Sequence, residues 1–582
     1  MGRLALFVAA MLGTGLATTS ELAWAGDVAP PPRVPPGFTV EKATPDGAVR
    51  FPMFAALDER GRLFVAESSG LDLYAEITAG TRKCRVSVLE DRDSDGRYES
   101  SRVFADGLVF PMGLAWRDGR LYVADPPDLV ALEDRDSDGR ADRRTAILTG
   151  FGHVDNGSLH GLTFGPDGLL YMTMGMPDGY RLAAADGSHL EGKSGALIRC
   201  RSDGSRPEVV CRGFVNLVEV AFLPDGDAIG TDNWYQQPEG GFRDALVHLV
   251  DGGLYPYVPD EGTPQPVTGE PLPSISRFPA VALSGLERYR GTSFPAGYRG
   301  SLFSAQHNAR RVGRHVLVPD GSSFRSEDSG FLTSEDPDFH PSDVLEDADG
   351  SLLVIDTGAW YVQHCPTGRI RASHSRGGIL RVRRMGAAKP DDPRGLRIGW
   401  AGLPLGRLAG LLADPRHLVR ERAGRELAGR GAAAIGPLGD VLRGPDANGK
   451  VEAVWALSAI PAPAALSPLR SALFDSDEEV ACAAARALAR RADRASEGDL
   501  LRLLSAGRPR ARLAAAEALA RCGSLRSLPA LWRSLAATPD RFLSHALVHA
   551  AHRLADAEAL QAALERPEPA VQGAALDRKS VV

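Results

Sequence analysis

Residues 166–175 read PDGLLYMTMG, a turn that carries Gly168 followed by a short apolar strand, and another apolar strand precedes the turn. This pattern occurs five more times along the chain. The other copies are ERGRLFVAES from Glu59, RDGRLYVADP from Arg117, PDGDAIGTDN from Pro224, YRGSLFSAQHN from Tyr298 and ADGSLLVIDTG from Ala348. A hairpin repeated at blade-sized intervals is typical of a β-propeller, whose small sheets bury their faces only against one another. Six copies predict a six-bladed β-propeller over residues 38–384.

A second kind of repeat follows a linker at residues 385–399, where the composition changes to Ala, Leu and Arg. Leucines recur at steps of 30 or 31 residues, with an alanine four residues before each of them. The leucines are Leu427, Leu457, Leu488 and Leu519, and the alanines are Ala423, Ala453, Ala484 and Ala515. Small residues at fixed helical positions let paired helices stack closely. Residues 400–576 are therefore predicted to form an α-solenoid of HEAT-like repeats. A plain helical bundle is the alternative, but it has no reason to keep this period.

Residues 1–25 have the features of a signal peptide. Arg3 supplies a positive charge, an apolar run follows, and Ala23-Trp24-Ala25 has the small-x-small pattern of a cleavage site. A Pro-rich linker at residues 26–37 leads to the first strand. We therefore expect an exported protein, periplasmic or secreted, with a retained N-terminal membrane anchor as the alternative. The net charge of -7 and the lack of a basic patch argue against a nucleic-acid partner.

The last six residues and two of the cysteines raise separate questions. Residues 577–582 match a translation of a common sequencing adapter, and no polar capping helix ends the repeats. The hypothesis is that these residues are a sequencing artefact, that the solenoid is truncated and that a C-terminal module is missing. Cys200 and Cys211 flank a turn and could form a disulfide in an exported protein, but a tight turn would not place them opposite each other.

Two acidic loops share one spacing, EDRDSDGRYE from Glu90 and EDRDSDGRAD from Glu133. Alternate carboxylates, a glycine for the sharp turn and an acid four residues after the last Asp can surround a hard cation with oxygen ligands. The predicted ligands are Asp91, Asp93, Asp95, Glu99, Asp134, Asp136, Asp138 and Asp142. We expect structural calcium here, between outer strands of a blade, because all spacings are kept in both copies. A solvated acidic turn without metal is the alternative.

The ends of the inner strands predict a second site. In a propeller, the residues that enter the innermost strand and those that leave its partner lie at one mouth of the channel. The entering residues include Met112, His160, Asn216, Ser284 and His340, and the leaving residues include Asp125, Asp232, Asn233, His307, Asn308 and Asp356. Histidines, amides and carboxylates at one opening offer a base and hydrogen-bond partners to a small molecule.

The sequence around these residues resembles the glucose/sorbosone dehydrogenase-like propellers. The resemblance lies in GSLHGLTFGPDGLLYMTMG from Gly157, GKSGALIRC from Gly192, GFVNLVEVAFLPDG from Gly213 and TDNWYQQPEGG from Thr231. The chain is most similar to the large exported proteins of planctomycetes that are called membrane-bound dehydrogenases and belong to the PVC-type haem-binding family. Those proteins join such a propeller to HEAT repeats and usually to a C-terminal c-type cytochrome domain.

The resemblance implies an oxidoreductase that oxidises a sugar or other alcohol with pyrroloquinoline quinone. His160 would be the catalytic base, while Asn216, Asp232, Asn233, His340 and Asp356 would orient the cofactor or substrate. Electrons would pass to a c-type haem module that this chain lacks. Val215 stands where the family has an arginine that contacts the anionic quinone. The alternative function is a non-catalytic, calcium-stabilised scaffold that binds glycans, with a protein partner on the solenoid.

Overall fold

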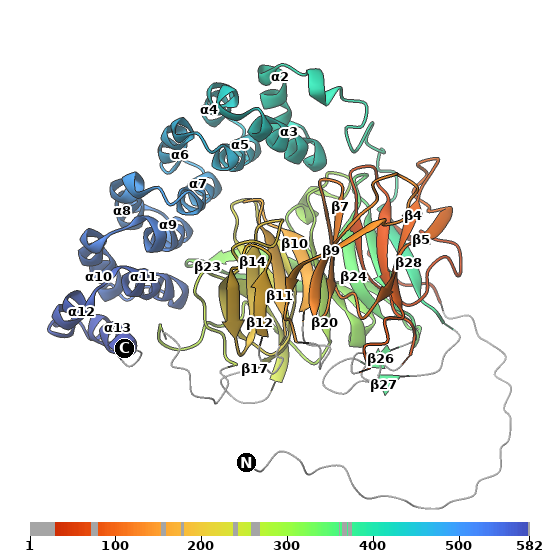
Figure 1. The fold of residues 1–582 in the computed structure, drawn as a ribbon, viewed down its shortest axis with the longest axis horizontal. Coiled ribbons are helices and arrows are strands. Elements are labelled where there is room, and N and C mark those ends of the chain that lie inside the picture. Colours follow the sequence, from red (N-terminus) through yellow and green to blue (C-terminus); the bar gives the residue numbers. More distant parts are fainter. Residues whose placement is uncertain are drawn as a thin grey trace, which may run out of the picture.

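The computed structural model describes residues 30–71, 79–152, 159–175, 180–236, 242–257, 268–359, 361–363, 369–370 and 375–579. The predicted signal peptide lies outside these residues. Figure 1 shows a ring of β-sheets with a curved row of helices along one of its faces. The predicted fold class is confirmed, since six sheets form the propeller and HEAT-type helices follow it.

Each of the six predicted hairpins forms the two inner strands of one blade. Blade 1 is β2(Pro52–Leu57), β3(Leu63–Glu67), β4(Cys84–Glu90) and β5(Ser100–Leu108). Blade 2 is β6(Leu114–Arg117), β7(Arg120–Asp125), β8(Asp128–Glu133) and β9(Arg143–Thr149), with β12(Tyr180–Ala184) and β13(His189–Gly192) added at its edge. Blade 3 is β10(Leu159–Phe164), β11(Leu170–Met174), β14(Gly195–Cys200) and β15(Glu208–Phe214).

Blades 4 to 6 repeat the same four-stranded order. Blade 4 is β16(Leu217–Phe222), β17(Ala228–Gln236), β18(Phe242–Leu249) and β19(Ser276–Phe278). Blade 5 is β20(Leu283–Arg288), β21(Leu302–Gln306), β22(Arg311–Asp320) and β23(Ser323–Thr333). Blade 6 is β24(Pro341–Glu346), β25(Leu352–Asp356) and β28(Gly378–Arg384), with β1(Phe38–Lys42) as its outer strand. A small separate hairpin consists of β26(Tyr361–Gln363) and β27(Arg369–Ile370).

The ring closes because the first strand joins the last blade. β1 pairs antiparallel with β28 from Phe38 opposite Arg384 to Lys42 opposite Leu380. The Phe38 ring also packs edge-on against Phe294 and Phe331 of the neighbouring blade, with ring centroids 4.8 and 5.3 Å away. The two ends of the propeller are thus held by main-chain hydrogen bonds and by buried aromatic contacts.

The helices stack in two layers, as their period predicts. The first helices are α2(Leu405–Gly410), α3(His417–Gly429), α4(Ile435–Leu442), α5(Ala447–Ala459), α6(Leu466–Ala472) and α7(Glu478–Arg490). They are followed by α8(Glu497–Ala506), α9(Pro509–Cys522), α10(Leu528–Ala536), α11(Arg541–Leu554), α12(Ala557–Leu564) and α13(Pro569–Lys579). All eight repeat leucines and alanines are completely buried, so close packing of α3, α5, α7 and α9 explains the repeat. Among the described residues, no helix has the length and apolarity to cross a membrane.

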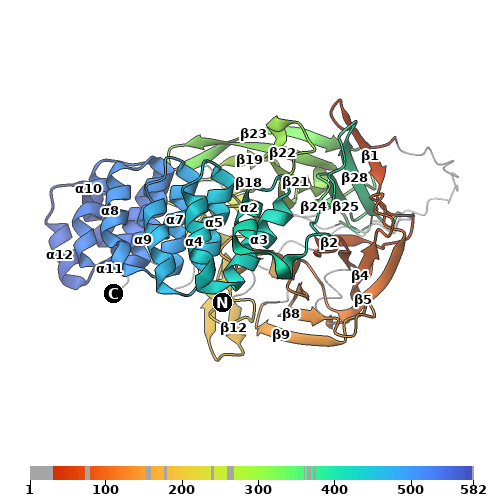
Figure 2. The ribbon, with the colours of Figure 1, turned by 90° about the horizontal axis from the view of Figure 1, so that it is seen from above.

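The inner row of helices lies against the propeller face that carries the six glycine turns, and Figure 2 shows this row from above. At the turn of blade 4, Trp455 Nε1 donates to Pro224 O at 2.9 Å. Arg486 donates to Asp225 O at 3.0 Å. Because a hairpin turn lies at one end of its strands, the predicted site residues lie at the opposite end of the channel.

A buried ionic network fixes this contact. Arg510 of α9 is 7% exposed and bridges Asp225 to Asp227, whose Oδ2 atom is 2.8 Å away. Arg486 and His248 also bind Asp227. Burial alone would raise the pKa of Asp227, but Arg486, His248 and Arg510 lower it well below its ordinary value. The carboxylate is therefore charged and held by the solenoid.

Cys200 and Cys211 do not form a disulfide. Both are buried free thiols, and Cys211 lies opposite Leu197 in the β14–β15 ladder. Arg199 lies opposite Glu208 in this hairpin, so Cys200 and Cys211 are not opposite each other across the two strands. Of the six cysteines in the chain, Cys365 lies outside the described residues.

Replacing Arg510 with methionine should destabilise the protein by about 3–5 kcal/mol, because the two buried carboxylates then lose one of the two arginines that pair with both of them. Urea denaturation followed by tryptophan fluorescence measures this change. The control is Arg502→Met, whose ion pair with Asp499 is exposed and should contribute less than about 1 kcal/mol. An unchanged unfolding midpoint for Arg510→Met would contradict a stabilising role of the interface.

Candidate functional site

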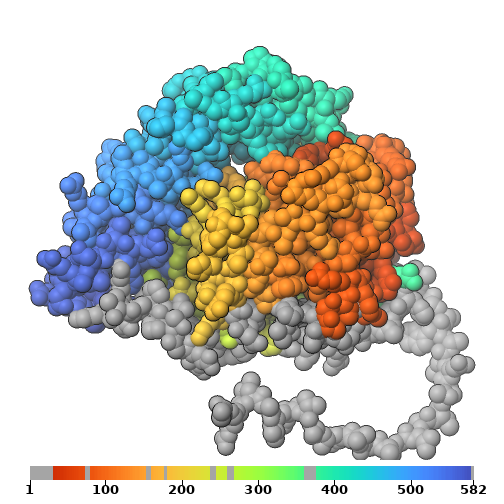
Figure 3. Space-filling view, in the orientation of Figure 1, coloured from red at the N-terminus to blue at the C-terminus, as the bar shows by residue number. Residues whose placement is uncertain are grey.

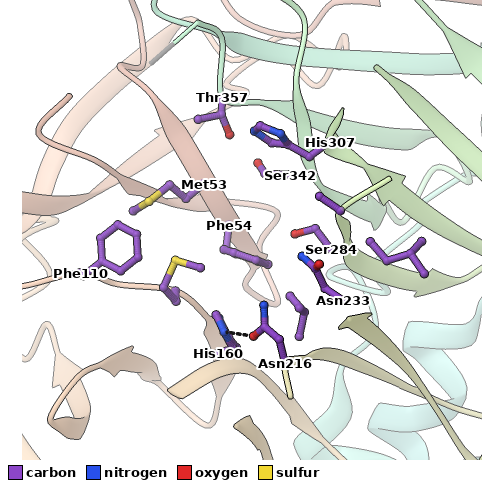
Figure 4. Close-up of a pocket in the computed structure, with 14 residues that line it drawn as sticks. Met53, Phe54, Phe110, His160, Asn216, Asn233, Ser284, His307, Ser342 and Thr357 are labelled. Carbon is purple, nitrogen blue, oxygen red and sulfur yellow. Dashed lines mark hydrogen bonds between the residues drawn. The ribbon is translucent and has the colours of Figure 1, made fainter. Parts of the chain in front are cut away.

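A small cavity lies in the propeller channel at the end away from the solenoid. Its volume is about 50 Å³. Fourteen residues from all six blades surround it, and Figure 4 shows them as sticks. They are Met53, Phe54, Phe110, Met112, His160, Asn216, Val218, Asn233, Ala282, Leu283, Ser284, His307, Ser342 and Thr357. The structure thus brings together six of the residues predicted at the channel mouth, which are Met112, His160, Asn216, Asn233, Ser284 and His307.

His160 and Asn216 form the best-defined polar pair in the cavity. His160 lies in β10 and Asn216 directly precedes β16, so neighbouring blades place them side by side. The distance from His160 Nε2 to Asn216 Oδ1 is 2.8 Å. Since an amide oxygen only accepts, Nε2 carries the hydrogen in this arrangement. Both side chains are almost completely buried, at 1% and 4% exposure.

Two further polar groups on the same side of the cavity have no hydrogen-bond partner among the residues that the structure describes. Asn233 is 4% exposed and its carboxamide makes no hydrogen bond with the described residues. The Ser284 hydroxyl is also unpaired among the described residues. Thr357 differs, because its hydroxyl donates to Pro52 O at 2.9 Å. Asn233 and Ser284 are therefore available to a ligand without loss of an internal hydrogen bond.

The opposite side of the cavity is apolar. Met53 and Phe54 come from blade 1, while Phe110 and Met112 precede the first strand of blade 2. Sequence reasoning placed Met112 at the mouth but missed Met53, Phe54 and Phe110. They look like ordinary core residues, and only their position in the closed ring shows that they face the channel.

His340 lies behind this lining. Its Nδ1 donates to Gly358 O at 2.9 Å, and its ring is 4.8 Å from that of His307. His307 lines the cavity while His340 does not. His340 therefore reaches the cavity only through His307.

Asp232 and Asp356 also lie outside the cavity lining, and both bind the backbone. Asp232 Oδ1 accepts from Asn216 N at 3.2 Å. Asp356 Oδ1 accepts from His340 N at 2.8 Å and from Gly358 N at 2.9 Å. Asp125 makes the equivalent contacts in blade 2, to Val109 N and Phe110 N. In each of these blades, a carboxylate at the end of the second strand thus accepts a hydrogen bond from the backbone segment that leads into a first strand.

Burial affects the charge of these carboxyls. It raises the pKa of Asp232 to about 7, and the charge of Asp244 raises it further. Burial likewise raises the pKa of Asp356 to about 7. A hydrogen bond from a backbone amide offsets part of this effect in each case.

The two acidic loops lie between outer strands, as predicted, in the β4–β5 and β8–β9 connections. In the first acidic loop (residues 91–99), oxygen atoms of Asp91, Asp93, Asp95 and Glu99 come within 4.8 Å of one another. In the second acidic loop (residues 134–142), the corresponding group is Asp134, Asp136 and Asp138. Asp142 is not part of this group and instead accepts from Arg135 N at 2.8 Å.

The carboxylates of the first acidic loop repel one another. Burial is the main cause that raises the pKa of Asp91, and the charges of Glu99 and Asp95 raise it further. Arg383 and Lys389 bind the loop carbonyls of Asp95 and Ser94, so this loop is fixed to blade 6 and the interdomain linker. The arrangement could hold a hard cation, because oxygen ligands converge on one point.

The cavity does not fit pyrroloquinoline quinone, the cofactor that the sequence resemblance implies. No lysine or arginine is among the described residues that line it, whereas an anionic quinone requires cationic partners. Its volume is also too small, since even benzene occupies a cavity of about 150 Å³.

Comparisons with known proteins agree with the two-domain fold. The family described as Domain of unknown function (DUF7133) matches residues 32–384, and the HEAT repeat family matches residues 468–552. The search of curated proteins finds no match.

The propeller is similar to several solved structures. A glucose dehydrogenase-type oxidoreductase from Thermus thermophilus is 19% identical, with 60% of this chain and 100% of that chain covered and a TM-score of 0.42. The PQQ-bound aldose sugar dehydrogenase of Streptomyces coelicolor is 16% identical, with 60% and 100% covered and a TM-score of 0.41. The pyranose dehydrogenase PQQ domain of Coprinopsis cinerea is 15% identical, with 61% and 97% covered and a TM-score of 0.40.

The raised pKa of Asp232 predicts a pH dependence of stability. The unfolded chain releases this proton near pH 4 but the folded protein only near pH 7, so the carboxyl lowers stability progressively as the pH rises through this range. Asp232→Asn keeps an acceptor for Asn216 N and should gain on the order of 2 kcal/mol relative to wild type between pH 5 and pH 8. Urea denaturation at both pH values measures this gain.

The matched control is Asp46→Asn, because Asp46 has a side chain that is 84% exposed. Its stability relative to wild type should be the same at both pH values. A constant difference between wild type and Asp232→Asn at pH 5 and pH 8 would show that Asp232 ionises normally in the folded protein.

Proposed function

The chain belongs to the DUF7133 family, and from that premise we propose that its propeller is an oxidoreductase-type module that binds a small, uncharged, hydroxyl-bearing molecule in the channel. The observation that supports this most directly is the pair of His160 and Asn216, 2.8 Å apart in the wall of the cavity. An imidazole in the cavity wall can act as a general base for a hydroxyl group when the ring nitrogen that faces the hydroxyl carries the lone pair.

His160 would accept the hydroxyl proton, and Asn216 would set which ring nitrogen is available. While Asn216 Oδ1 accepts from Nε2, the lone pair of a neutral imidazole is at Nδ1. When the Asn216 amide rotates, its NH₂ group faces Nε2 and donates to it. The lone pair of the imidazole is then at Nε2. A substrate hydroxyl that takes the place of the amide would then donate its hydrogen to the Nε2 lone pair, at the distance that now separates Nε2 from the amide.

The remaining cavity residues would orient the substrate. Asn233 and Ser284 offer a carboxamide and a hydroxyl that have no other described partner, and the apolar side faces carbon atoms. A cavity of about 50 Å³ holds about four waters, so it would take only the reacting end of a sugar or other alcohol. The rest of the substrate would lie at the channel mouth.

Oxidation also requires an electron acceptor. When bound, pyrroloquinoline quinone accepts hydride in related enzymes, but the cavity does not fit it. Export to the periplasm is a proposal that rests on the signal-peptide features of residues 1–25. Electron transfer to a c-type haem module is a proposal that rests on the sequence resemblance.

Binding without turnover is the second candidate function. The absence of cationic residues from the described cavity lining favours it, because such a lining offers no charged partner to an anionic cofactor. In this case the channel would recognise a neutral glycan end or another small molecule. The inner side of the solenoid is occupied by the propeller, so a protein partner would have to bind elsewhere on the helices.

Substitution of His160 tests the enzymatic function. Dye-linked oxidation of a panel of sugars and alcohols, with and without added quinone, should fall about 10²–10⁴-fold in His160→Gln, because the base is lost. His189→Gln, which changes an exposed histidine of β13, is the matched control and should retain wild-type activity.

Calorimetry with the same substrates separates the two candidate functions. Turnover that is unaffected by His160→Gln would exclude His160 as the base. Binding without turnover, weakened by Asn233→Ala, would instead establish the recognition function.

We also propose that the acidic loops bind structural calcium. Calcium should raise the melting temperature of the wild type by a few degrees, since a ligand at 100 times its Kd stabilises the folded state by about 2.7 kcal/mol. Asp93→Asn and Asp136→Asn should each reduce this rise, while Asp186→Asn in an exposed turn should not. Equal melting temperatures in calcium and in chelator would contradict the proposal.

A further inference from the structure

A second hollow, much larger than the channel cavity, lies between the solenoid and the propeller. Its volume is about 1020 Å³. It is lined by α3 and the segment after it, by the glycine turns of blades 1 and 2, and by both acidic loops. Figure 3 shows the beginning of the solenoid, in teal, lying over the red and orange blades. We call this hollow the interdomain groove.

We infer that the interdomain groove binds an acidic oligosaccharide, a polyhydroxylated ligand that carries carboxylate groups. This proposal concerns a different site from the channel and does not depend on its function. Ligand sites occur preferentially between domains, and typical ligand pockets have volumes of about 300–1,000 Å³. The interdomain groove is therefore large enough for several sugar rings.

The two walls of the groove have opposite charge. The solenoid wall carries Arg422, Arg425 and Arg430 with only one acid, Glu426. The propeller wall contains six acids, Asp58, Glu59, Glu90, Asp91, Asp118 and Asp134, and four arginines, Arg60, Arg62, Arg92 and Arg102. Among these described residues, no ion pair crosses from one wall to the other. The charges thus face an open space and are accessible to a ligand.

Most of the charged side chains have partners within their own wall. Arg62 pairs with Asp58 at 2.6 Å, and Arg102 pairs with Glu90 at 2.6 Å. Arg60 and Arg425 are exposed, and neither guanidinium has a carboxylate partner among the described residues. Free guanidinium groups can bind carboxylates through two parallel hydrogen bonds.

A third arginine lies near Arg425. Burial lowers the pKa of Arg117, and the positive charge of Arg425 lowers it further. Asp118, at 3.6 Å, only partly offsets this repulsion because its side chain is 76% exposed. An anionic group between α3 and the turn of blade 2 would reduce the repulsion between Arg117 and Arg425.

The acidic residues determine the rest of the ligand. A simple inorganic anion would be repelled by Glu59, Asp118 and Glu426, which line the same groove as the free arginines. Sugar hydroxyls can donate hydrogen bonds to these carboxylates while the uronate groups bind the arginines. A chain that carries both kinds of group therefore matches the mixed walls better than a neutral sugar or a free anion.

Calorimetry on the full chain tests this inference with trigalacturonate, maltotriose and inorganic phosphate as probes. Trigalacturonate should bind at least tenfold more tightly than the other two. Arg60→Ala and Arg425→Ala should each weaken its binding about fivefold or more, and they should melt like the wild type because neither guanidinium has a carboxylate partner among the described residues. Arg502→Ala, which changes an exposed arginine on α8, is the matched control and should bind normally.

Three results would overturn the inference. These are the absence of trigalacturonate binding, equal binding of maltotriose, or equal affinity in Arg425→Ala and wild type. Phosphate binding as tight as that of trigalacturonate would show a site for a bare anion and would also overturn it. His160→Gln should bind trigalacturonate normally, so failure of the channel proposal and failure of this inference give distinguishable results.

Discussion

Closure of the ring by β1 is the constraint on which the channel cavity depends. His160, Asn216, Ser284 and His307 come from blades 3, 4 and 5, while the apolar lining comes from blades 1 and 2. No single sheet brings these side chains together. The pairing of β1 with β28 fixes the circumference of the ring, and the contacts of Phe38 join the last two blades. The cavity is therefore a property of the closed ring and not of any local motif.

The solenoid imposes the second constraint, because it packs against the opposite face of the propeller. Arg290 in blade 5 binds Glu421 of α3 at 2.9 Å, near the buried side chains of Glu287 and Glu346. Together with the network around Asp227, this contact makes the helices part of the propeller's stability. A HEAT solenoid often presents its inner side to a separate partner. Here that side packs against the propeller of the same chain, and the interdomain groove lies between them.

The fold could be predicted from the sequence because each of the two repeats follows from how its strands or helices pack. Gly61, Gly119 and Gly350 have positive φ angles that the hairpin turns require, so the glycine pattern follows from backbone geometry. The site could be predicted only in part. The position of His160 and Asn216 follows from strand order, whereas Met53 and Phe110 could not be distinguished from core residues. The interdomain groove was not predictable, since it depends on how two separate repeats are placed against each other.

The buried carboxylates show why residue type alone misleads at a channel mouth. Asp232 and Asp356 are carboxylic acids beside the channel mouth, as catalytic acids would be. Each instead accepts a hydrogen bond from a backbone amide. The repeated position of such acids, including Asp125, follows from the need to satisfy amide groups where a strand begins beside the channel. With these acids committed to the backbone, the polar side chains that line the cavity include the imidazoles of His160 and His307, the amides of Asn216 and Asn233, and the hydroxyl of Ser284. That set suits proton transfer and recognition of an uncharged group, and among the described lining residues there is no cation to hold an anionic cofactor.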